Sequence, residues 1–267
     1  MCYNSGWSAW LNGELIGSYL GDANIESANL TLTFPEGLAK STGENVLLVV
    51  HDDTGHDETS GALYPRGILQ ATLLSGGDTS LDFTRWRVAG TAGGESNLDP
   101  VRGVYNEDGL FAERVGWHLP AFDDSRWPSI SSGYSATNLG FPGAGVKFYR
   151  TVVPLSIPSG VDVSIAFVLS APNAKNTAFR AQLFVNGYQY GRFNPYIGNQ
   201  VVFPVPPGVL DYTGDNTIGV VIWAQTEAGA QVTVDWQVNY VAESSLDVTF
   251  DGQALRPRWS EARLRYA

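Results

Sequence analysis

The chain has 267 residues, of which 16% are charged and 12% aromatic, and it contains 30 glycines and 14 prolines. This length can bury a substantial apolar core without metals or disulfides, and the many turn-forming residues favour short strands over helical bundles. The formal charge of −11 repels phosphate backbones and anionic lipid headgroups, so we expect neither nucleic acid nor a membrane as a partner.

The first part of the chain is expected to hold a hairpin and three further strands. Asn12-Gly13 separates SAWL from ELIGSY, and this pair readily takes the two positive φ angles of a type I′ turn. The later strands are expected at LTLTF (30–34), which alternates with its apolar residues inward, at the apolar run VLLVV (46–50), and at ILQATLL (68–74).

The second part contains one short helix and more strands. A helix is expected in NEDGLFAER (106–114), with strands at VKFYRTVVPL (146–155) and VDVSIAFVL (161–169). Asn186-Gly187 marks a second hairpin, and the apolar run IGVVIW (218–223) indicates a strand covered on both faces. The last strand, QVTVDWQVNYV, alternates with one face expected inward, namely Val232, Val234, Trp236, Val238 and Tyr240.

The two parts repeat one pattern. Asn12-Gly13 and Gly17 match Asn186-Gly187 and Gly191 at an offset of 174 positions. GENVLLVV (43–50) then matches GDNTIGVV (214–221) at an offset of 171, so one three-residue gap reconciles the two. A polar loop and a closing strand follow in each copy. The chain is therefore predicted to contain two copies of one β module.

The two copies are unequal in length. More than a hundred residues with strands of their own separate the second hairpin from the first copy, whereas the first copy begins almost at Met1. A whole sandwich of this kind has roughly eight strands, so the first copy is expected to lack its opening strands. Uncovered sheet edges and apolar faces favour aggregation. We therefore expect this chain to be the tail of a longer protein.

Residues 51–58, HDDTGHDE, concentrate metal-ligand side chains in one segment. His51, Asp53, His56 and Asp57 offer nitrogen and oxygen atoms suited to zinc or calcium. Their spacing fits neither the H-E-x-x-H helix nor the twelve-residue calcium loop. A metal site, a contact with another domain and a polar turn stay open as interpretations. The pattern favours the turn, in which Asp and Thr side chains bond backbone N–H groups, so no metal ligand is predicted.

The segment GWHLPAFDDSRWP is a second candidate. Asp123 and Asp124 lie beside Trp117, His118 and Trp127, a composition compatible with acid/base carboxylates in an aromatic sugar site. Adjacent strand residues point to opposite faces, however, so two neighbouring aspartates rarely serve one reacting centre. The pattern favours a loop that carries buried tryptophans, and no catalytic residue is predicted.

Other functional signatures are missing from the sequence. It has no G-x-S-x-G elbow, phosphate loop or dinucleotide fingerprint, so no cofactor is predicted. Cys2 is the only cysteine, which excludes an internal disulfide. No run approaches the roughly 18 apolar residues of a spanning helix, and MCYNSGWSAW lacks the layout of a signal peptide. Asn29-Leu30-Thr31 is an N-x-S/T acceptor, which makes Asn29 a candidate N-glycosylation site.

Five long stretches occur in order along the chain: SAWLNGELIGSYLG, LTLTFPEG, VLLVVHDDTGHDETSGALYPRGILQATLL, NEDGLFAERVGWHLPAFDDSRWP and RAQLFVNGYQYGRFNPYIGNQVVFPVPPGVL. Together they resemble the C-terminal jelly-roll region of large fungal β-galactosidases of glycoside hydrolase family 35. The resemblance runs through about residue 243, and LDVTFDGQALRPRWSEARLRYA is similar to the natural tail of such enzymes. It implies that residues 51–58 form a jelly-roll loop.

The resemblance implies a parent enzyme that hydrolyses terminal β-D-galactosides outside the cell, with two glutamates on an N-terminal barrel in a retaining mechanism. Neither glutamate motif occurs here, so no catalytic residue is carried over and the chain alone is expected to be inactive. The missing catalytic barrel is the expected partner. The alternative is a free-standing galactoside-binding module, because jelly rolls often bind sugars and eight tryptophans supply stacking surfaces.

We therefore predict an all-β chain made of two jelly-roll, galactose-binding-domain-like β-sandwiches. The first, over residues 1–78, is expected to be truncated at its N-terminus. The second is expected to be complete over residues 79–243, and a C-terminal tail over residues 244–267 is expected to follow it.

Overall fold

The computed structural model describes residues 6–22, 28–52, 67–76, 79–88, 110–130, 137–172, 178–206, 208–245 and 257–266. They belong to two compact units. The first unit comprises residues 1–87 with 143–145 and 224–229, and the second comprises residues 88–142, 146–223 and 230–267. No helix in the described ranges is long and apolar enough to cross a membrane.

The first unit is built on a three-stranded antiparallel sheet. β1 (Gly6–Leu11) lies in the centre, between β2 (Glu14–Tyr19) and β3 (Leu47–Asp52). A separate two-stranded sheet pairs β4 (Leu73–Ser75) with β5 (Thr79–Leu81). The predicted apolar run at 46–50 is thus confirmed as a strand in nearly all of its length.

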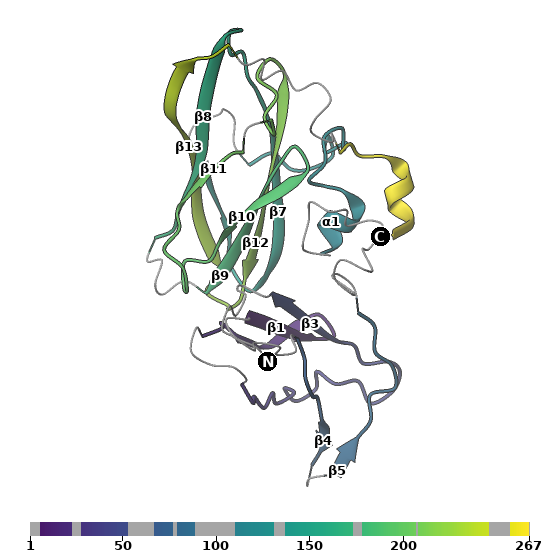
Figure 1. Ribbon diagram of the computed structural model, residues 1–267. Helices are drawn as coiled ribbons and strands as arrows, with labels where there is room; N and C mark the ends of the chain where they lie inside the picture. Colours follow the sequence, from purple (N-terminus) through teal and green to yellow (C-terminus); the bar gives the residue numbers. More distant parts are fainter. Residues whose placement is uncertain are drawn as a thin grey trace, which may run out of the picture. The chain divides into compact units, whose positions relative to one another are not determined.

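The second unit is a sandwich of two four-stranded sheets, with the strand orders β10-β9-β12-β7 and β11-β8-β13-β6 (Figure 1). Eight strands in two facing sheets form the jelly-roll architecture that the sequence predicts. The strand bounds are β6 (Thr137–Phe141), β7 (Gly145–Pro154), β8 (Val161–Ser170), β9 (Phe179–Val185), β10 (Tyr188–Phe193), β11 (Val202–Pro204), β12 (Asp215–Ala224) and β13 (Ala230–Glu243).

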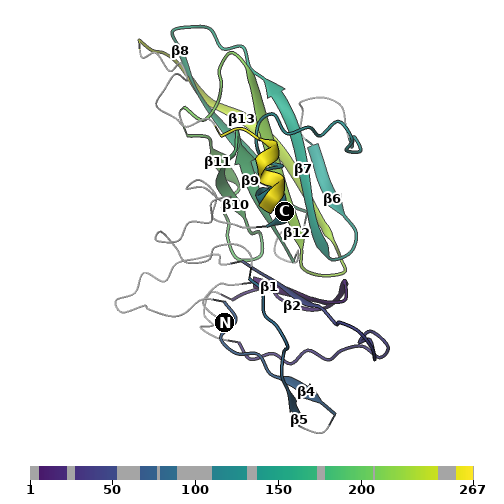
Figure 2. The same cartoon turned by 90° about the vertical axis from the view of Figure 1, so that its right-hand side faces the viewer.

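Two helices accompany this sandwich. The helix predicted in 106–114 is confirmed over residues 111–114 as part of α1 (Phe111–Val115), which ends at Gly116 with a φ of 81°, whereas residues 106–109 lie outside the described residues. A 3-10 helix, η3 (Glu261–Tyr266), was not predicted from the sequence. Figures 1 and 2 show both helices on the side of the β10-β9-β12-β7 sheet that faces away from the other sheet. Strands β9 and β12 are therefore covered on both faces, which agrees with the continuous apolar run at 218–223.

Both predicted hairpin turns are confirmed by their backbone angles. Asn12 and Gly13 have φ values of 52° and 96°, and Asn186 and Gly187 have φ values of 48° and 89°. Two successive positive φ angles define the type I′ turn, and asparagine and glycine adopt them with little strain.

The repeat extends to side-chain hydrogen bonds. Asn12 Nδ2 donates to Asn45 Oδ1 at 2.9 Å, and Asn186 Nδ2 donates to Asn216 Oδ1 at 2.8 Å. The two donors are 174 positions apart and the two acceptors are 171 positions apart, as the aligned sequence copies require. In each copy the same pair of asparagines therefore joins the hairpin turn to the start of the strand that pairs beside the hairpin, β3 in the first copy and β12 in the second.

A shared packing contact also relates the copies. Each hairpin has a register shift that is followed by a glycine, Gly17 in β2 and Gly191 in β10. A Cβ on Gly17 would lie 2.5 Å from Leu32 Cδ2, and a Cβ on Gly191 would lie 2.9 Å from Phe203 Cδ1. Both glycines are required because an apolar side chain from the aligned segment packs directly on the backbone.

Two strand predictions for the first unit are wrong. LTLTF (30–34) is not a strand, and only the last two residues of ILQATLL (68–74), Leu73 and Leu74, lie in one, namely β4. In the second unit the aligned segment β11 pairs with β8, and the closing strand β13 pairs with β8 and β6. The described part of the first unit has no counterpart of β8, and a segment without a hydrogen-bonding neighbour cannot form a ladder.

The inward face predicted for the last strand is only partly correct. Val232 is fully buried and Trp236 half-buried, but Val238 and Tyr240 are exposed. β13 has 14 residues, whereas the longest strands of the facing sheet have ten, so its end extends past the sheet that would cover it. A bulge between Val238 and Tyr240 also shifts the alternation.

Candidate functional site

The segment proposed for metal binding is only partly described. His51 and Asp52 end β3, where His51 is half-buried and Asp52 is buried. The other candidate ligands, Asp53, His56 and Asp57, lie outside the described residues. Within the described ranges no group of three or more histidine, cysteine, aspartate or glutamate side chains is arranged to hold a metal ion.

The two neighbouring aspartates have separate structural roles. Asp123 is exposed, and hydrogen bonds from the Ser125 side chain and from Ser125 N, which lies 3.0 Å from Asp123 Oδ1, lower the pKa of its carboxyl group. Asp124 forms an ion pair with Arg150, whose side chain is only 3% exposed. The Arg150 guanidinium also donates to Leu119 O at 3.3 Å. Each of the two carboxylates therefore has a structural partner of its own.

Aromatic rings near these aspartates pack on one another. The Trp117 ring centroid lies 5.0 Å from that of Trp127 and 5.9 Å from that of Phe148 on β7, both edge-on. Phe122 lies 5.7 Å from Trp127. Edge-on contacts of this kind stabilise a core beyond the apolar area that they bury. The two tryptophans of the segment, predicted to be buried, are half-buried, and their rings attach the loop to β7 through Phe148.

His118 is a buried histidine in the same loop. Its ring lies 5.2 Å from the ring of Phe184 on β9. Burial, with a smaller contribution from the positive charge of Arg263, lowers the pKa of His118 from 6.5 to about 3. The imidazole is therefore neutral near pH 7, and it cannot serve as the protonated partner of a carboxylate pair.

Acid is expected to destabilise the second unit through His118. Because its folded pKa lies below its unfolded value, the unfolded state takes up the proton first as the pH falls. The stabilisation is complete above about pH 6.5 and is lost toward pH 3, with a slope of up to about 1.4 kcal/mol per pH unit. Urea midpoints of the native chain and of His118→Gln at pH 7 and pH 5 measure this loss. An equal loss in His118→Gln would contradict the assignment.

The C-terminal segment is held against α1 and the following loop. Trp259 Nε1 donates to Val115 O at 2.8 Å, and Trp259 N donates to Pro120 O at 2.9 Å. Arg263 Nη2 donates to Glu113 O at 2.7 Å, a carbonyl near the end of the helix that also accepts from Gly116 N at 3.1 Å. This docking was missed in the sequence, where tryptophan and arginine close to a chain end had no visible partner.

Trp259→Ala is expected to lower the stability of the second unit by about 2 kcal/mol. This value is below the range for a fully buried tryptophan because Trp259 is half-buried. Hydrogen exchange at residues 257–266 should rise at the same time, since the contacts with Val115 and Pro120 are lost. Trp86→Ala is the control, because Trp86 is 53% exposed. A similar loss of stability in both variants would contradict the docking role.

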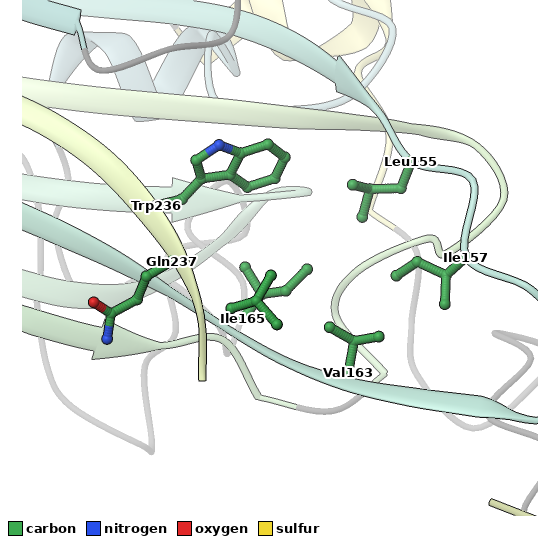
Figure 3. Close-up of a pocket in the computed structure, with 7 residues that line it drawn as sticks. Leu155, Ile157, Val163, Ile165, Trp236 and Gln237 are labelled. Atoms are coloured by element: carbon green, nitrogen blue, oxygen red, sulfur yellow. The ribbon is translucent and has the colours of Figure 1, made fainter. Parts of the chain in front are cut away.

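An apolar groove of about 210 Å³ in the second unit is lined by side chains of β8, of β13 and of the segment after β7 (Figure 3). The Trp236 ring stacks on the ring of Phe167 from the neighbouring strand β8, and the two ring centroids are 6.3 Å apart. The amide of Gln237 points away from the apolar side chains in Figure 3 and donates to Asn239 Oδ1 at 2.9 Å. The groove thus offers stacking without converging hydrogen-bond groups, and a sugar needs both. Its lining residues are Leu155, Ile157, Val163, Ile165, Trp236, Gln237 and Val238.

The first unit exposes many large apolar side chains. Single exposed apolar residues are normal on a protein surface, whereas a contiguous patch of them marks an interaction surface. Asn29 is exposed beside one of them, so its side chain is accessible to modification. Among the described residues of the first unit, the exposed large apolar ones are Leu30, Val46, Leu48, Ile68, Leu69, Leu74, Leu81 and Trp86.

Known proteins resemble this chain along nearly its whole length. A family described as "Beta-galactosidase second all-beta domain" matches residues 2–57 and 111–228. "Probable beta-galactosidase B" of Aspergillus fumigatus and that of Aspergillus niger are each 67% identical, over 266 and 267 residues, and each match covers 98% of this chain. The match covers 26% of each relative, so the chain spans about a quarter of their length.

Likeness to solved structures is weak. A structure described as "Structure of a family 35 carbohydrate binding module from an environmental isolate" is 18% identical with a TM-score of 0.24, covering 39% of this chain and 74% of the other. "EclA C-terminal domain; sugar-binding protein" is 16% identical with a TM-score of 0.26, covering 50% of this chain and 99% of the other. Scores at this level carry no argument about function.

Proposed function

Because this chain belongs to the family of β-galactosidase second all-β domains, we propose that it is the non-catalytic C-terminal β-sandwich region of an enzyme that hydrolyses terminal β-D-galactosides. Its role is to support the catalytic barrel of the same enzyme, which is its main partner. The observation that carries the proposal is the 67% identity over 98% of this chain to relatives about four times as long.

The candidate sites support a structural role. Asp123 and Asp124 serve a turn and an ion pair, and His118 is buried and neutral. A retaining glycosidase needs two carboxyl groups about 5 Å apart across an open cleft. In the described residues no carboxylate pair meets that requirement beside the apolar groove.

The proposed function is tested with a chimera. In the chimera, this chain replaces the matched region of the Aspergillus niger relative, and in the deletion that region is removed. The rates at which the two proteins hydrolyse a chromogenic β-galactoside are then compared. The chimera should retain most of the activity, whereas the deletion should lose it together with thermal stability. A deletion that is as active and as stable as the chimera would contradict a supporting role.

A free-standing galactoside-binding module is the second candidate, favoured by the half-buried Trp236 ring at the groove. Titration of this chain with galactose, followed by tryptophan fluorescence, tests it. We expect no saturable change, because the groove lacks converging hydrogen-bond groups. A saturable change that Trp236→Ala abolishes would favour the binding module instead.

The proposal also covers the expected modules and the location of the protein. We propose a truncated first sandwich over residues 1–78, a complete second one over residues 79–243 and a tail over residues 244–267. For a parent enzyme that acts outside the cell, Asn29 is the proposed glycosylation site. The test treats the secreted chimera with an N-glycosidase and measures its mass. A decrease in mass that is absent in the Asn29→Gln variant would establish glycosylation at Asn29.

A further inference from the structure

One edge of β13 has no strand beside it over most of its length. β8 pairs with residues 233–243 of β13, whereas β6 pairs only with residues 230–234. In the part of the chain that the structure describes, no other strand pairs with β13. The edge from residue 235 onward is therefore open on the side of β6, and an open edge can accept a further strand.

Hydrogen bonds of β8 show which of its backbone groups face β13. Leu169 N donates to Val201 O at 2.9 Å, and Val205 N donates to Ile165 O at 2.9 Å. These bonds connect odd-numbered residues of β8 to the segment that contains β11. Because the backbone groups of successive strand residues point in opposite directions, the even-numbered residues of β8 bond to β13.

The backbone groups of Trp236 and Val238 consequently point to the open edge. The even-numbered residues of β8 pair with Asp235 and Gln237, so these two residues bond to β8. Trp236 and Val238 alternate with them and direct their N–H and C=O groups the other way. Both side chains also line the apolar groove (Figure 3). A strand added at this edge would thus place every second side chain over the groove.

Asp235 covers the first backbone donor of this edge. Its Oδ1 accepts a hydrogen bond from Trp236 N at 2.8 Å, and Asp235 is exposed. A strand whose carbonyl group takes the Trp236 N–H displaces the carboxylate. The displaced carboxylate then favours a positive charge on the residue directly opposite it, because oppositely charged cross-strand pairs stabilise a sheet.

The charges of the two sheets favour the same kind of partner. Strands β6, β8, β11 and β13 contain no lysine or arginine, and their carboxylates are Asp162, Asp235 and Glu243. The basic residues of the facing sheet are Lys147, Arg150, Arg180 and Arg192, and its one carboxylate is Asp215. The sheet with the open edge is therefore acidic, so it repels the same sheet of a second copy and attracts a basic segment.

We propose that the open edge of β13 binds an extended segment of a separate, basic polypeptide by β-strand addition. The segment carries Val, Ile or Leu at the positions over the groove, and Lys or Arg at the positions opposite Asp235 and Gln237. Main-chain bonds to Trp236 and Val238 and the filling of the groove supply the affinity. Asp235 determines the preference for a positive charge.

Peptide binding to this chain tests the proposal. The probe is the synthetic peptide Lys-Val-Lys-Val-Lys-Val-Lys with blocked ends. One control peptide has Glu in place of every Lys, and the other has the same composition in two blocks, Lys-Lys-Lys-Lys-Val-Val-Val. Calorimetry should give binding of the alternating peptide that is at least about tenfold tighter than that of either control. Amide exchange of Val238 should become at least about tenfold slower with the alternating peptide, and exchange in β9 should not change.

Matched variants test the role of Asp235. Asp235→Asn keeps an oxygen that can accept from Trp236 N but removes the charge, so it should weaken binding of the alternating peptide about fivefold. Asp215→Asn is the control, because Asp215 is an exposed carboxylate on the facing sheet. It should change the affinity less than about twofold. Both variants should keep the Tm of the chain within about 2 °C, since both positions are exposed.

Several outcomes would overturn the proposal. Equal affinities of the alternating and block peptides would show attraction by charge alone, and equal effects of the two variants would exclude a special role of Asp235. Tight binding without slower exchange at Val238 would place the peptide elsewhere. Slow exchange at Val238 without any peptide would mean that the edge is already covered, by this chain if its mass in light scattering is that of a monomer, or by a second copy if the mass is doubled.

Discussion

Asn216→Ala is expected to destabilise the second unit by about 3 kcal/mol. Asn216 is 1% exposed, and its Oδ1 accepts bonds from Asp211 N at 2.7 Å and from Asn186 Nδ2 at 2.8 Å. Its Nδ2 donates to Asp211 O at 2.8 Å. Alanine would remove these bonds from the buried Asn186 and the half-buried Asp211, and each such loss costs about 1–3 kcal/mol. Urea unfolding followed by tryptophan fluorescence measures the change.

The repeat provides a matched control for this prediction. Asn45 accepts from Lys40 N at 2.8 Å and from Asn12 Nδ2 at 2.9 Å, and it donates to Lys40 O at 2.9 Å. Asn45 is exposed, so water can replace these bonds. Asn45→Ala should therefore cost less than about 1 kcal/mol. Equal losses at the two sites would show that burial does not govern the contribution of this asparagine network.

Asp124→Ala is expected to destabilise the second unit by about 2–3 kcal/mol. The variant leaves the Arg150 guanidinium, which is 3% exposed, without its carboxylate. Breaking a fully buried pair costs about 3–5 kcal/mol, and the lower value is expected because the Asp124 side chain is 36% exposed. Thermal or urea unfolding of the isolated chain measures the loss.

Its neighbour Asp123 is the control. Asp123→Ala removes an exposed bond to Ser125 N and should lower the stability much less than Asp124→Ala does. In the active chimera, both variants should keep the kcat of the remaining folded enzyme unchanged. A large fall in kcat with native stability, in either variant, would revive the interpretation of these aspartates as acid/base groups.

Local chemistry explains why much of the fold is readable from the sequence. Asn12-Gly13 and Asn186-Gly187 predict type I′ turns because few other residue pairs adopt two positive φ angles cheaply. The alternation in VDVSIAFVL predicts a strand, and this strand forms as β8 because its partner strands are present in the second unit. The repeat is detectable because the two copies keep the same turns, the same glycine contact and the same asparagine pair.

The candidate sites were harder to assign from the sequence. The adjacent positions of Asp123 and Asp124 predict that the two side chains have separate roles. The partner of Asp124, Arg150, lies 26 positions away, so no local pattern in the sequence reveals it. The docking of Trp259 on Val115 joins residues 144 positions apart. Long-range partners of this kind depend on how the strands and loops pack.

By itself, the sequence determined the all-β class, the two hairpins, the repeat and the absence of a recognised catalytic motif, because turn chemistry, side-chain alternation and motif spacing act over a few residues. Only the tertiary structure decided that LTLTF is not a strand, that the end of β13 is exposed and that His118 is buried and neutral. Strand pairing, burial and pKa depend on neighbours distant in the chain. Leu32 illustrates the difference, since its apolar alternation predicts a strand that requires a partner to form.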